Sequence, residues 1–346
     1  MMMKWVTFLF LFLLSLVSPL LAEDDHNALN VMSYGAEGDG KTDDTKVKGT
    51  IVAPSKINDY GCDDNKCEQW IMFSHLNGFT LYGNGVIDAQ GSDWWSTCDY
   101  SKHFFQRCPV RPTAVKITDC NNAHVKDLQI INSAQMHVVI HQSAYVYLNN
   151  VKIIAPEDSP NTDGDDCISI GTGTSELYIY KIRCGPGHGI SIGSLGKNGS
   201  WDTVENISVS HVDFWGTTNG VRIKTWQGGN GYARNITFEK INVHNARNPI
   251  IIDQFYCDHT HCKNQASAVQ ISDISYRQVK GTSERETAVN FACSESVPCK
   301  GIVAEDISIK AARDDQKTSS YCLNVQGTGY GKIIPTVPCL GYSNHS

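Results

Sequence analysis

The sequence predicts an all-β fold, namely a right-handed parallel β-helix that forms a single domain. Short β-branched runs recur along the 346-residue chain, with starting points at residues 115, 138, 168, 190, 221, 250 and 289. Asn and Gly, which favour turns, separate these runs. No amphipathic pattern that would indicate a longer helix follows the N-terminal segment. Repeated short strands that stack at about 4.8 Å bury a continuous core, as in a β-solenoid.

The repeated runs are typified by Val115–Ile117, Ile168–Ile170 and Val221–Ile223. Their spacing varies from 22 to 39 residues, so an irregular β-sandwich stays open as the alternative. We expect the β-helix to extend from about Trp70 to about Ile309.

The N-terminal segment has the features of a secretory signal. Lys4 precedes an apolar run that reaches Ala22, and Glu23 begins an acidic stretch. We therefore expect a signal peptide over residues 1–22 and a mature domain over 23–346, with an uncleaved membrane anchor as the alternative. No other run is long and apolar enough to span a bilayer, which argues against stable membrane insertion.

The chain contains 13 cysteines, which in a secreted protein are expected to form disulfides. Spacing suggests six pairs: Cys62–Cys67, Cys98–Cys108, Cys167–Cys184, Cys257–Cys262, Cys293–Cys299 and Cys322–Cys339. Cys120 is left over, and we expect it to be a buried thiol. Zinc coordination is the alternative, although the chain has no C-x-x-C pair.

The sequons and the net charge limit the kinds of molecule that this protein is expected to bind. Glycosylation sequons occur at Asn198, Asn206, Asn235 and Asn344, as expected for an extracellular protein. The net charge of −7 argues against nucleic acid as a partner, and an anionic substrate would require a local basic patch.

Ionisable residues gather within or just before three of the strand runs. They are Asp163, Asp165, Asp166, His188, Arg222 and Lys224. If the strands stack in register, these side chains converge on one patch. Carboxylates beside a histidine and two cations suit the hydrolysis of a glycosidic bond in an anionic sugar chain. Solvated turn residues and a solvated strand face are the alternatives for them.

Four short motifs occur in order within longer characteristic runs. They are Asn161-Thr162-Asp163, Asp165-Asp166, Gly187-His188-Gly189 and Arg222-Ile223-Lys224. With these motifs the chain resembles the plant polygalacturonases, which are pectin-cleaving glycoside hydrolases, over nearly all of its mature length. The resemblance implies a pectin-lyase-like β-helix that cleaves α-1,4-galacturonosyl bonds with inversion and without a metal or cofactor.

The resemblance also implies roles for individual residues. Asp165 would be the general acid, while Asp163 and Asp166 would activate the attacking water. His188 would support the protonation state of the acid. The residues expected to bind substrate are Asn161, Arg222, Lys224 and Tyr256, with the two cations gripping the sugar carboxylate. Asn161 has a second interpretation, as the cap of its turn.

The chain departs from the family pattern at two places. The family has about one coil of twenty residues between the NTD and DD motifs, whereas here Asp165 directly follows Gly164. We therefore expect Asp163 to stand off from the other acids and activity to be impaired. After Thr45 the chain also lacks a capping helix and about one coil.

Three functions remain open at this point. The first is a secreted, monomeric pectin hydrolase of the cell wall that acts on polygalacturonate. The second is a catalytically impaired pectin-binding protein on the same scaffold. The third is a pectate lyase, which would need calcium and would not explain the conjunction of His188 with Arg222 and Lys224.

Overall fold

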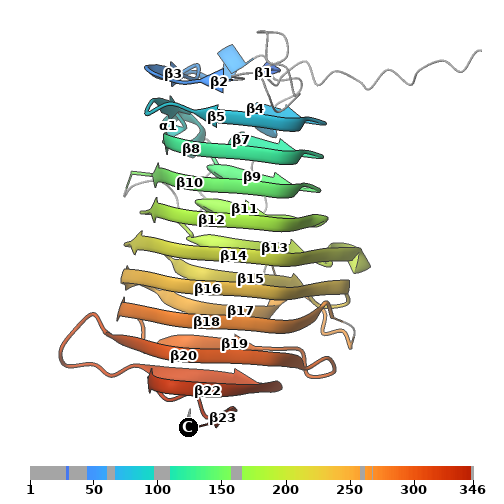
Figure 1. Ribbon diagram of the computed structural model, residues 1–346, viewed down its shortest axis with the longest axis vertical. Coiled ribbons are helices and arrows are strands. Elements are labelled where there is room, and N and C mark those ends of the chain that lie inside the picture. Colours follow the sequence, from blue (N-terminus) through green and yellow to red (C-terminus); the bar gives the residue numbers. More distant parts are fainter. Residues whose placement is uncertain are drawn as a thin grey trace, which may run out of the picture.

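A computed structural model describes residues 29–30, 45–60, 67–96, 110–156, 166–257, 262–266 and 268–343. Its strands stack as the rungs of a parallel β-helix, from β1 at one end to β23 at the other (Figure 1). All the pairings between the described strands that define the two sheets are parallel, as in β10 with β12 and β15 with β17. The predicted fold class is therefore confirmed.

Ten of the described strands form the first sheet. In sheet order they are β1 (Leu29–Asn30), β4 (Gln69–Ser74), β7 (Thr113–Thr118), β9 (Val138–His141), β11 (Ile168–Ile170), β13 (Ile190–Leu195), β15 (Asn219–Trp226), β17 (Asn248–Tyr256), β19 (Thr287–Ala292) and β21 (Ser319–Leu323).

Longer strands form the second sheet. They are β2 (Thr45–Lys46), β5 (Asn77–Tyr82), β8 (Asn121–Ile131), β10 (Ala144–Ile154), β12 (Thr174–Cys184), β14 (Trp201–Trp215), β16 (Asn230–Ala246), β18 (Gln270–Ser283), β20 (Cys299–Ala311), β22 (Val325–Ile334) and β23 (Leu340–Tyr342), with β3 (Thr50–Val52) and β6 (Val86–Asp88) beside them. The short helices among the described residues are η2 (Ile57–Tyr60), α1 (Ser92–Ser96) and η4 (Lys197–Gly199).

The repeated runs of the sequence become one register of the first sheet. Ile168 pairs with Val138 on one side and with Ile190 on the other, and Ile190 in turn pairs with Val221. The unequal spacing of the runs in the sequence arises because the turns and loops between rungs differ in length. Side chains that follow or precede these positions by the same number of residues therefore lie in columns along the helix axis.

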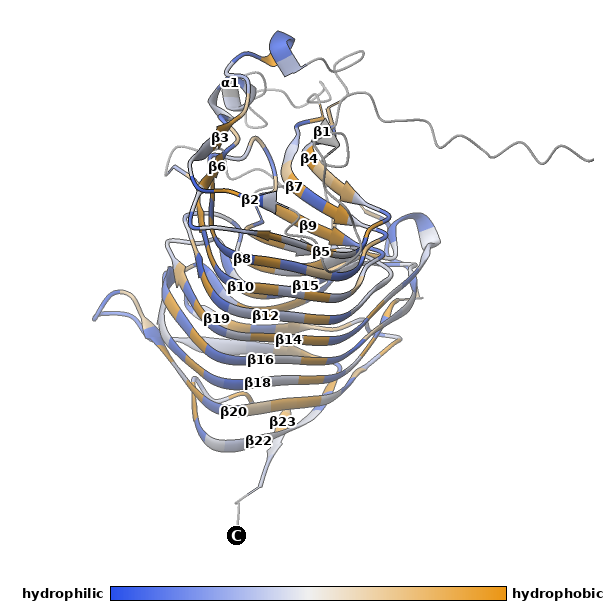
Figure 2. Cartoon of the chain, turned by 45° about the horizontal axis from the view of Figure 1, so that its top comes forward, coloured by the Kyte–Doolittle hydropathy of each residue, from blue (hydrophilic) through white to orange (hydrophobic). Residues whose placement is uncertain are grey.

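The core is built from alternating side chains of both sheets, and apolar segments recur along the strands in Figure 2. Phe238 stacks on Tyr276 with ring centroids 5.3 Å apart, and Tyr276 contacts Phe291 at 5.6 Å. The hydroxyl of Tyr276 is buried and has no hydrogen-bond partner among the described residues. Burial accordingly raises the pKa of this phenol.

The long strands of the second sheet contain residues with a positive φ at more than one position. One of these positions recurs on seven successive rungs, at Asp127, Asn150, Lys181, His211, Lys240, Gln278 and Asp306, with φ between 52° and 57°. Left-handed backbone of this kind is favourable for Asn and Asp but costs energy for Lys and His. These residues line a groove on the outer face of this sheet that runs from rung to rung.

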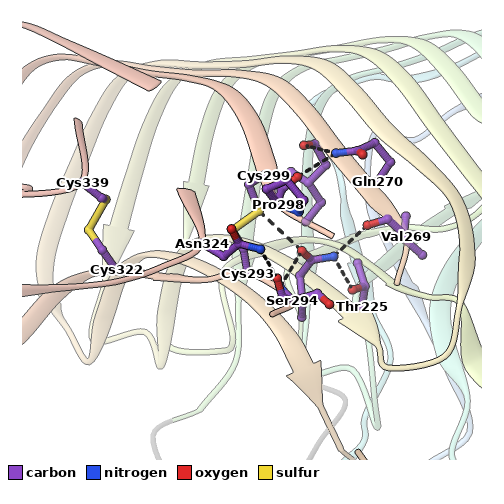
Figure 3. The surroundings of a disulfide bond; sticks show 12 residues. Thr225, Val269, Gln270, Cys293, Ser294, Pro298, Cys299, Cys322, Asn324 and Cys339 are labelled. Carbon is purple, nitrogen blue, oxygen red and sulfur yellow. Dashed lines mark hydrogen bonds between the residues drawn. A yellow bond between two sulfur atoms is a disulfide. The ribbon is translucent and has the colours of Figure 1, made fainter. Parts of the chain in front are cut away.

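Four of the expected disulfides are present, namely Cys167–Cys184, Cys257–Cys262, Cys293–Cys299 and Cys322–Cys339. Figure 3 shows the Cys293–Cys299 bond beside Ser294, whose carbonyl accepts a hydrogen bond of 2.6 Å from Asn324 Nδ2. Cys67 is disulfide-bonded, and Cys62, Cys98 and Cys108 lie outside the described residues. Cys120 is a buried free thiol, as expected.

The expected limits of the β-helix were too narrow. Beyond Ile309, β21 pairs with β19, β22 with β20 and β23 with β22, so the rungs continue to Tyr342. The Ser319–Leu323 segment lacks a β-branched run, and its pairing rests on backbone hydrogen bonds instead. The signal peptide expected over residues 1–22 lies outside the described residues. None of the described helices has the length and apolar character needed to cross a membrane.

Two substitutions in the aromatic stack test this description of the core. We expect Tyr276→Phe to raise the free energy of unfolding by about 1 kcal/mol, because it removes a buried hydroxyl without a partner. Phe238→Ala should lower the same quantity by about 3–5 kcal/mol, since it leaves a cavity beside Tyr276. Urea denaturation measures both. A loss of stability in Tyr276→Phe would mean that the hydroxyl has a partner.

Candidate active site

A buried carboxylate lies at the centre of the candidate site. Asp166 immediately precedes the disulfide-bonded Cys167 at the start of the rung that carries β11, and its residue surface is fully buried. Its Oδ1 atom accepts hydrogen bonds from Arg222 Nη2 at 2.9 Å and from Ser191 Oγ at 2.8 Å. Its Oδ2 atom accepts one from Lys224 Nζ at 3.1 Å. Such complete pairing is what a buried charge requires.

The two cations decide the ionisation of Asp166. Burial alone would raise the pKa of the Asp166 carboxyl, but the charges of Lys224 and Arg222 outweigh burial and hold the pKa at about 2. His188 and the hydrogen bond from Ser191 act in the same direction. Asp166 is therefore an anion throughout the mildly acidic range.

Both cations come from β15, two rungs beyond Asp166. Arg222 and Lys224 are two residues apart in the strand and so point to the same face. Ser191, from the intervening rung, is in register with Arg222, and its Oγ accepts a hydrogen bond of 2.9 Å from Arg222 Nε. Sequence reasoning missed Ser191, although its place between Ile190 and Ile192 marks it as the outward residue of its rung.

His188 lies on the rung between Asp166 and the cations. It is buried, and burial lowers the pKa of its imidazole to about 4 against the attraction of Asp166. The imidazole is therefore neutral near pH 6. Asn219 Nδ2 donates a hydrogen bond of 3.2 Å to the His188 carbonyl. Gly189, with φ of +81°, allows the next rung to approach, because a Cβ there would lie 2.2 Å from the Asn219 carbonyl oxygen.

Two further groups of β17 border the cluster. The Tyr256 ring lies with its centroid 5.3 Å from Lys224 Nζ and meets Trp226 edge-on at 5.4 Å. Asp253 is in register with Lys224, and burial raises the pKa of its carboxyl despite Arg222 and Lys224. Sequence reasoning did not select Asp253, whose only signal is its place three residues before Tyr256.

The structure thus brings Asp166, His188, Arg222 and Lys224 into one buried cluster and places Tyr256 against it. The cations also form ion pairs with Asp166, a contact that the sequence analysis did not predict, and their expected role in binding substrate stays a prediction. Asn161, Asp163 and Asp165 lie outside the described residues, so the expected displacement of Asp163 stays a prediction.

The sequons also remain predictions, and their surroundings differ. Asn198 is an exposed residue of η4. Asn235 is exposed, and its Nδ2 donates to Asn206 Oδ1 at 2.6 Å. Asn206 Nδ2 in turn donates to Glu176 on the preceding rung. Asn344 lies outside the described residues.

The burial of His188 and the charges around it predict the pKa of its imidazole. We expect the imidazole to titrate near pH 4, and we expect Arg222→Gln to raise its pKa because a neighbouring positive charge is removed. Since the folded pKa lies below the unfolded value near 6.5, the associated stability is present above pH 6.5 and is lost as the pH falls toward 4.

NMR titration of the histidine resonances measures this pKa, with assignment by His188→Gln. The distant Arg277→Gln serves as the control and should leave the pKa unchanged. A wild-type pKa at or above 6.5 would contradict the described burial.

Comparisons with known proteins agree with the fold and with the motifs. The profile of Glycosyl hydrolases family 28 matches residues 30–164 and 164–333, and its two parts meet at Gly164. A probable polygalacturonase of Arabidopsis thaliana is 39% identical over 386 residues, which cover 92% of this chain and 81% of the relative. A polygalacturonase of Prunus persica is 37% identical and covers 96% of this chain and 97% of its own length.

Solved structures show the same architecture. A polygalacturonase from Erwinia carotovora superposes with a TM-score of 0.61 at 22% identity, covering 81% of each chain. An endo-xylogalacturonan hydrolase from Aspergillus tubingensis gives a TM-score of 0.60 at 24% identity, covering 87% of this chain and 84% of its own. Because the family profile spans most of the sequence, the chain belongs to glycosyl hydrolase family 28.

Proposed function

We propose that this family 28 glycoside hydrolase is a polygalacturonase, which hydrolyses α-1,4-galacturonosyl bonds of pectin in the cell wall with inversion. The observation that supports this most directly is the convergence of Arg222 and Lys224 on the buried carboxylate of Asp166. Two cations in one cluster provide recognition of a uronic acid. Relatives that cover almost the whole chain are themselves polygalacturonases.

The roles follow the family motifs. Asp165 donates a proton to the leaving oxygen, and Asp166, with Asp163, accepts a proton from the attacking water. His188 sets the protonation state of the acid. Arg222 and Lys224 hold the sugar carboxylate, while Tyr256 and Asn161 contact the substrate. These steps use side chains of the protein alone.

The pairing of Asp166 suggests how substrate activates the base. With a pKa of about 2, the free carboxylate is a poor proton acceptor. A galacturonate carboxylate that draws Arg222 and Lys224 toward itself weakens their hold on Asp166. The pKa of Asp166 then rises, and the carboxylate becomes a stronger base beside the bound sugar.

The four disulfides suit an oxidising compartment. We place the protein outside the cell, with residues 1–22 as its signal peptide and 23–346 as one monomeric catalytic domain.

A missing coil should limit the rate. The family profile breaks at Gly164, where the NTD and DD motifs are joined directly, and the 386-residue alignment exceeds the 346 residues of this chain. With no coil between the two motifs, we expect Asp163, the third carboxylate, to stand off from Asp165 and Asp166. An inverting enzyme needs its acid and base roughly 6.5–9.5 Å apart with water between them.

An assay of reducing ends released from polygalacturonate tests the proposed function. We expect Asp166→Asn to lower kcat by roughly 10²–10⁴-fold, since it removes a proton acceptor. Arg222→Ala should raise KM on polygalacturonate more than on its methyl-esterified form, because esterification removes the negative charge. The surface variant Lys317→Ala is the control. Release of unsaturated products, or loss of all activity with a calcium chelator, would instead indicate a lyase.

Insertion of a coil tests the reason for impairment. We expect about twenty residues of a family relative, placed between Gly164 and Asp165, to raise kcat on polygalacturonate by at least tenfold, because the acid and the base then occupy neighbouring rungs. A flexible Gly/Ser insert of equal length is the control and should not raise it. If Asp163→Ala and Asp165→Ala were equally damaging in a fully active unmodified chain, the missing-coil explanation would be wrong.

A further inference from the structure

A cavity lies away from the candidate site, on the outer face of the second sheet. It has a volume of about 860 Å³ and follows the positive-φ residues that recur on seven rungs. Its lining comes from β8, β10, β12, β14, β16, β18 and β20, with Asn84 from the turn between β5 and β6. The Asp166 cluster lies on the first sheet, so the two sites occupy different faces of the β-helix.

One column of polar side chains runs along this groove. In register from rung to rung, it consists of Gln129, Lys152, Arg183, Asp213, Asn242, Lys280 and Ser308. At about 4.8 Å per rung, the column extends for roughly 30 Å. An extended polymer lying along the axis would meet a hydrogen-bonding side chain at every rung.

The cations of this column form no ion pair within the part of the chain that the structure describes. Among the described residues, no carboxylate lies within ion-pair distance of Lys152, Arg183 or Lys280. Lys152 and Arg183 are directly opposite each other on neighbouring strands. Like charges in that position destabilise a sheet. On its other side Arg183 faces Asp213 in register, whereas Lys152 and Lys280 face no carboxylate in the column, and all three cations are exposed.

The acids of the groove are already engaged. Asp127 Oδ1 accepts a hydrogen bond of 2.7 Å from Asn150, and Asp213 Oδ1 accepts one of 2.6 Å from Asn242. Asp306 Oδ1 accepts one from the Lys332 amide at 3.2 Å. These donors are neutral and the acids keep their charge, but the column holds three cations against one acid, Asp213. Its net positive charge points to a ligand that brings its own negative charge.

An exposed aromatic ring adds a second kind of contact. A smaller cavity of about 340 Å³ shares Lys152, Arg183 and Asp213 with the groove and is also lined by Trp215. Trp215 is 53% exposed and stacks on His244 with ring centroids 3.9 Å apart. The stack fixes the indole with one face available, and such a rigid apolar face suits the C–H face of a sugar ring.

We propose that this groove is a second, non-catalytic docking site for an acidic polysaccharide, with Lys152, Arg183 and Lys280 binding uronate carboxylates and Trp215 packing on a sugar ring. The choice of polygalacturonate as its ligand rests on the proposed function. Docking there would hold a polymer on the enzyme between cleavages and so would affect long substrates only.

The test compares long and short substrates in matched variants. Lys152→Ala/Arg183→Ala/Lys280→Ala removes the three groove charges. Lys48→Ala/Lys300→Ala/Lys310→Ala removes three exposed charges elsewhere and serves as its control. Trp215→Ala is matched by Trp201→Ala, which removes the 73%-exposed Trp at the other end of β14. Binding to long polygalacturonate is measured by calorimetry in an Asp165→Asn background, and hydrolysis of a galacturonate trimer in the otherwise native protein.

We expect the groove triple variant to bind polygalacturonate roughly tenfold more weakly at low salt, because three exposed charge contacts are lost. Its hydrolysis of the trimer should match that of the wild type. Trp215→Ala should also weaken polymer binding, whereas both control variants should bind normally. Polymer binding that is unchanged in the groove variants, or equally weakened in the controls, would overturn the docking site. Absence of trimer hydrolysis in every protein would instead refute the proposed function and leave the binding comparison intact.

Discussion

The ion pairs of Asp166 are the interaction on which the candidate site depends. A carboxylate buried at this depth is tolerated only because Arg222 and Lys224 reach back across an intervening rung to neutralise it. That reach needs β11, β13 and β15 to be stacked in strict register, and Ser191 completes the bridge between them. Removing Asp166 would leave both cations without their counter-charge, whereas removing one cation would leave Asp166 paired with the other. The site and the solenoid that carries it are thus mutually dependent.

The same interaction links binding to chemistry. Two cations paired with one carboxylate form a cluster with net positive charge, which attracts a uronate. His188 stays neutral beside them because it is buried and because the cations repel its proton. In the mechanism that we propose, a carboxylate on the substrate competes with Asp166 for the cations, so recognition of the sugar and activation of the base become one event. A neutral sugar would leave Asp166 a poor base.

Much of this arrangement follows from the sequence. The β-branched runs predict the rungs, and equal offsets from Ile168, Ile190 and Val221 predict which charged residues meet. The four disulfides of the described residues follow from spacing within or between adjacent turns. By contrast, spacing places Arg222 on a rung but does not say how far its side chain reaches, so its bond to Asp166 was not predicted. Ser191 and Asp253 were missed because a strand serine and a strand aspartate carry no distinct pattern.

The groove was hidden from sequence reasoning for a related reason. It depends on residues with a positive φ at Lys181, His211 and Lys240. Lys and His rarely adopt a left-handed backbone, so their presence in the sequence does not predict one. Its cations are scattered along the chain and become neighbours only through register. On these proposals the enzyme binds a polyanion at two sites. The Asp166 cluster on the first sheet is the catalytic site, and the groove on the second sheet is a docking site.

The idea that substrate releases Asp166 from its cations can be measured directly. The carbon-13 signal of the Asp166 carboxyl, assigned through Asp166→Asn, would be titrated in an Asp165→Asn background with and without a galacturonate oligomer. We predict a pKa near 2 in the free protein and a clear rise when the oligomer binds, with no rise for the methyl-esterified oligomer. A pKa that does not change with bound oligomer, or that rises equally with the esterified one, would contradict carboxylate exchange at Arg222 and Lys224.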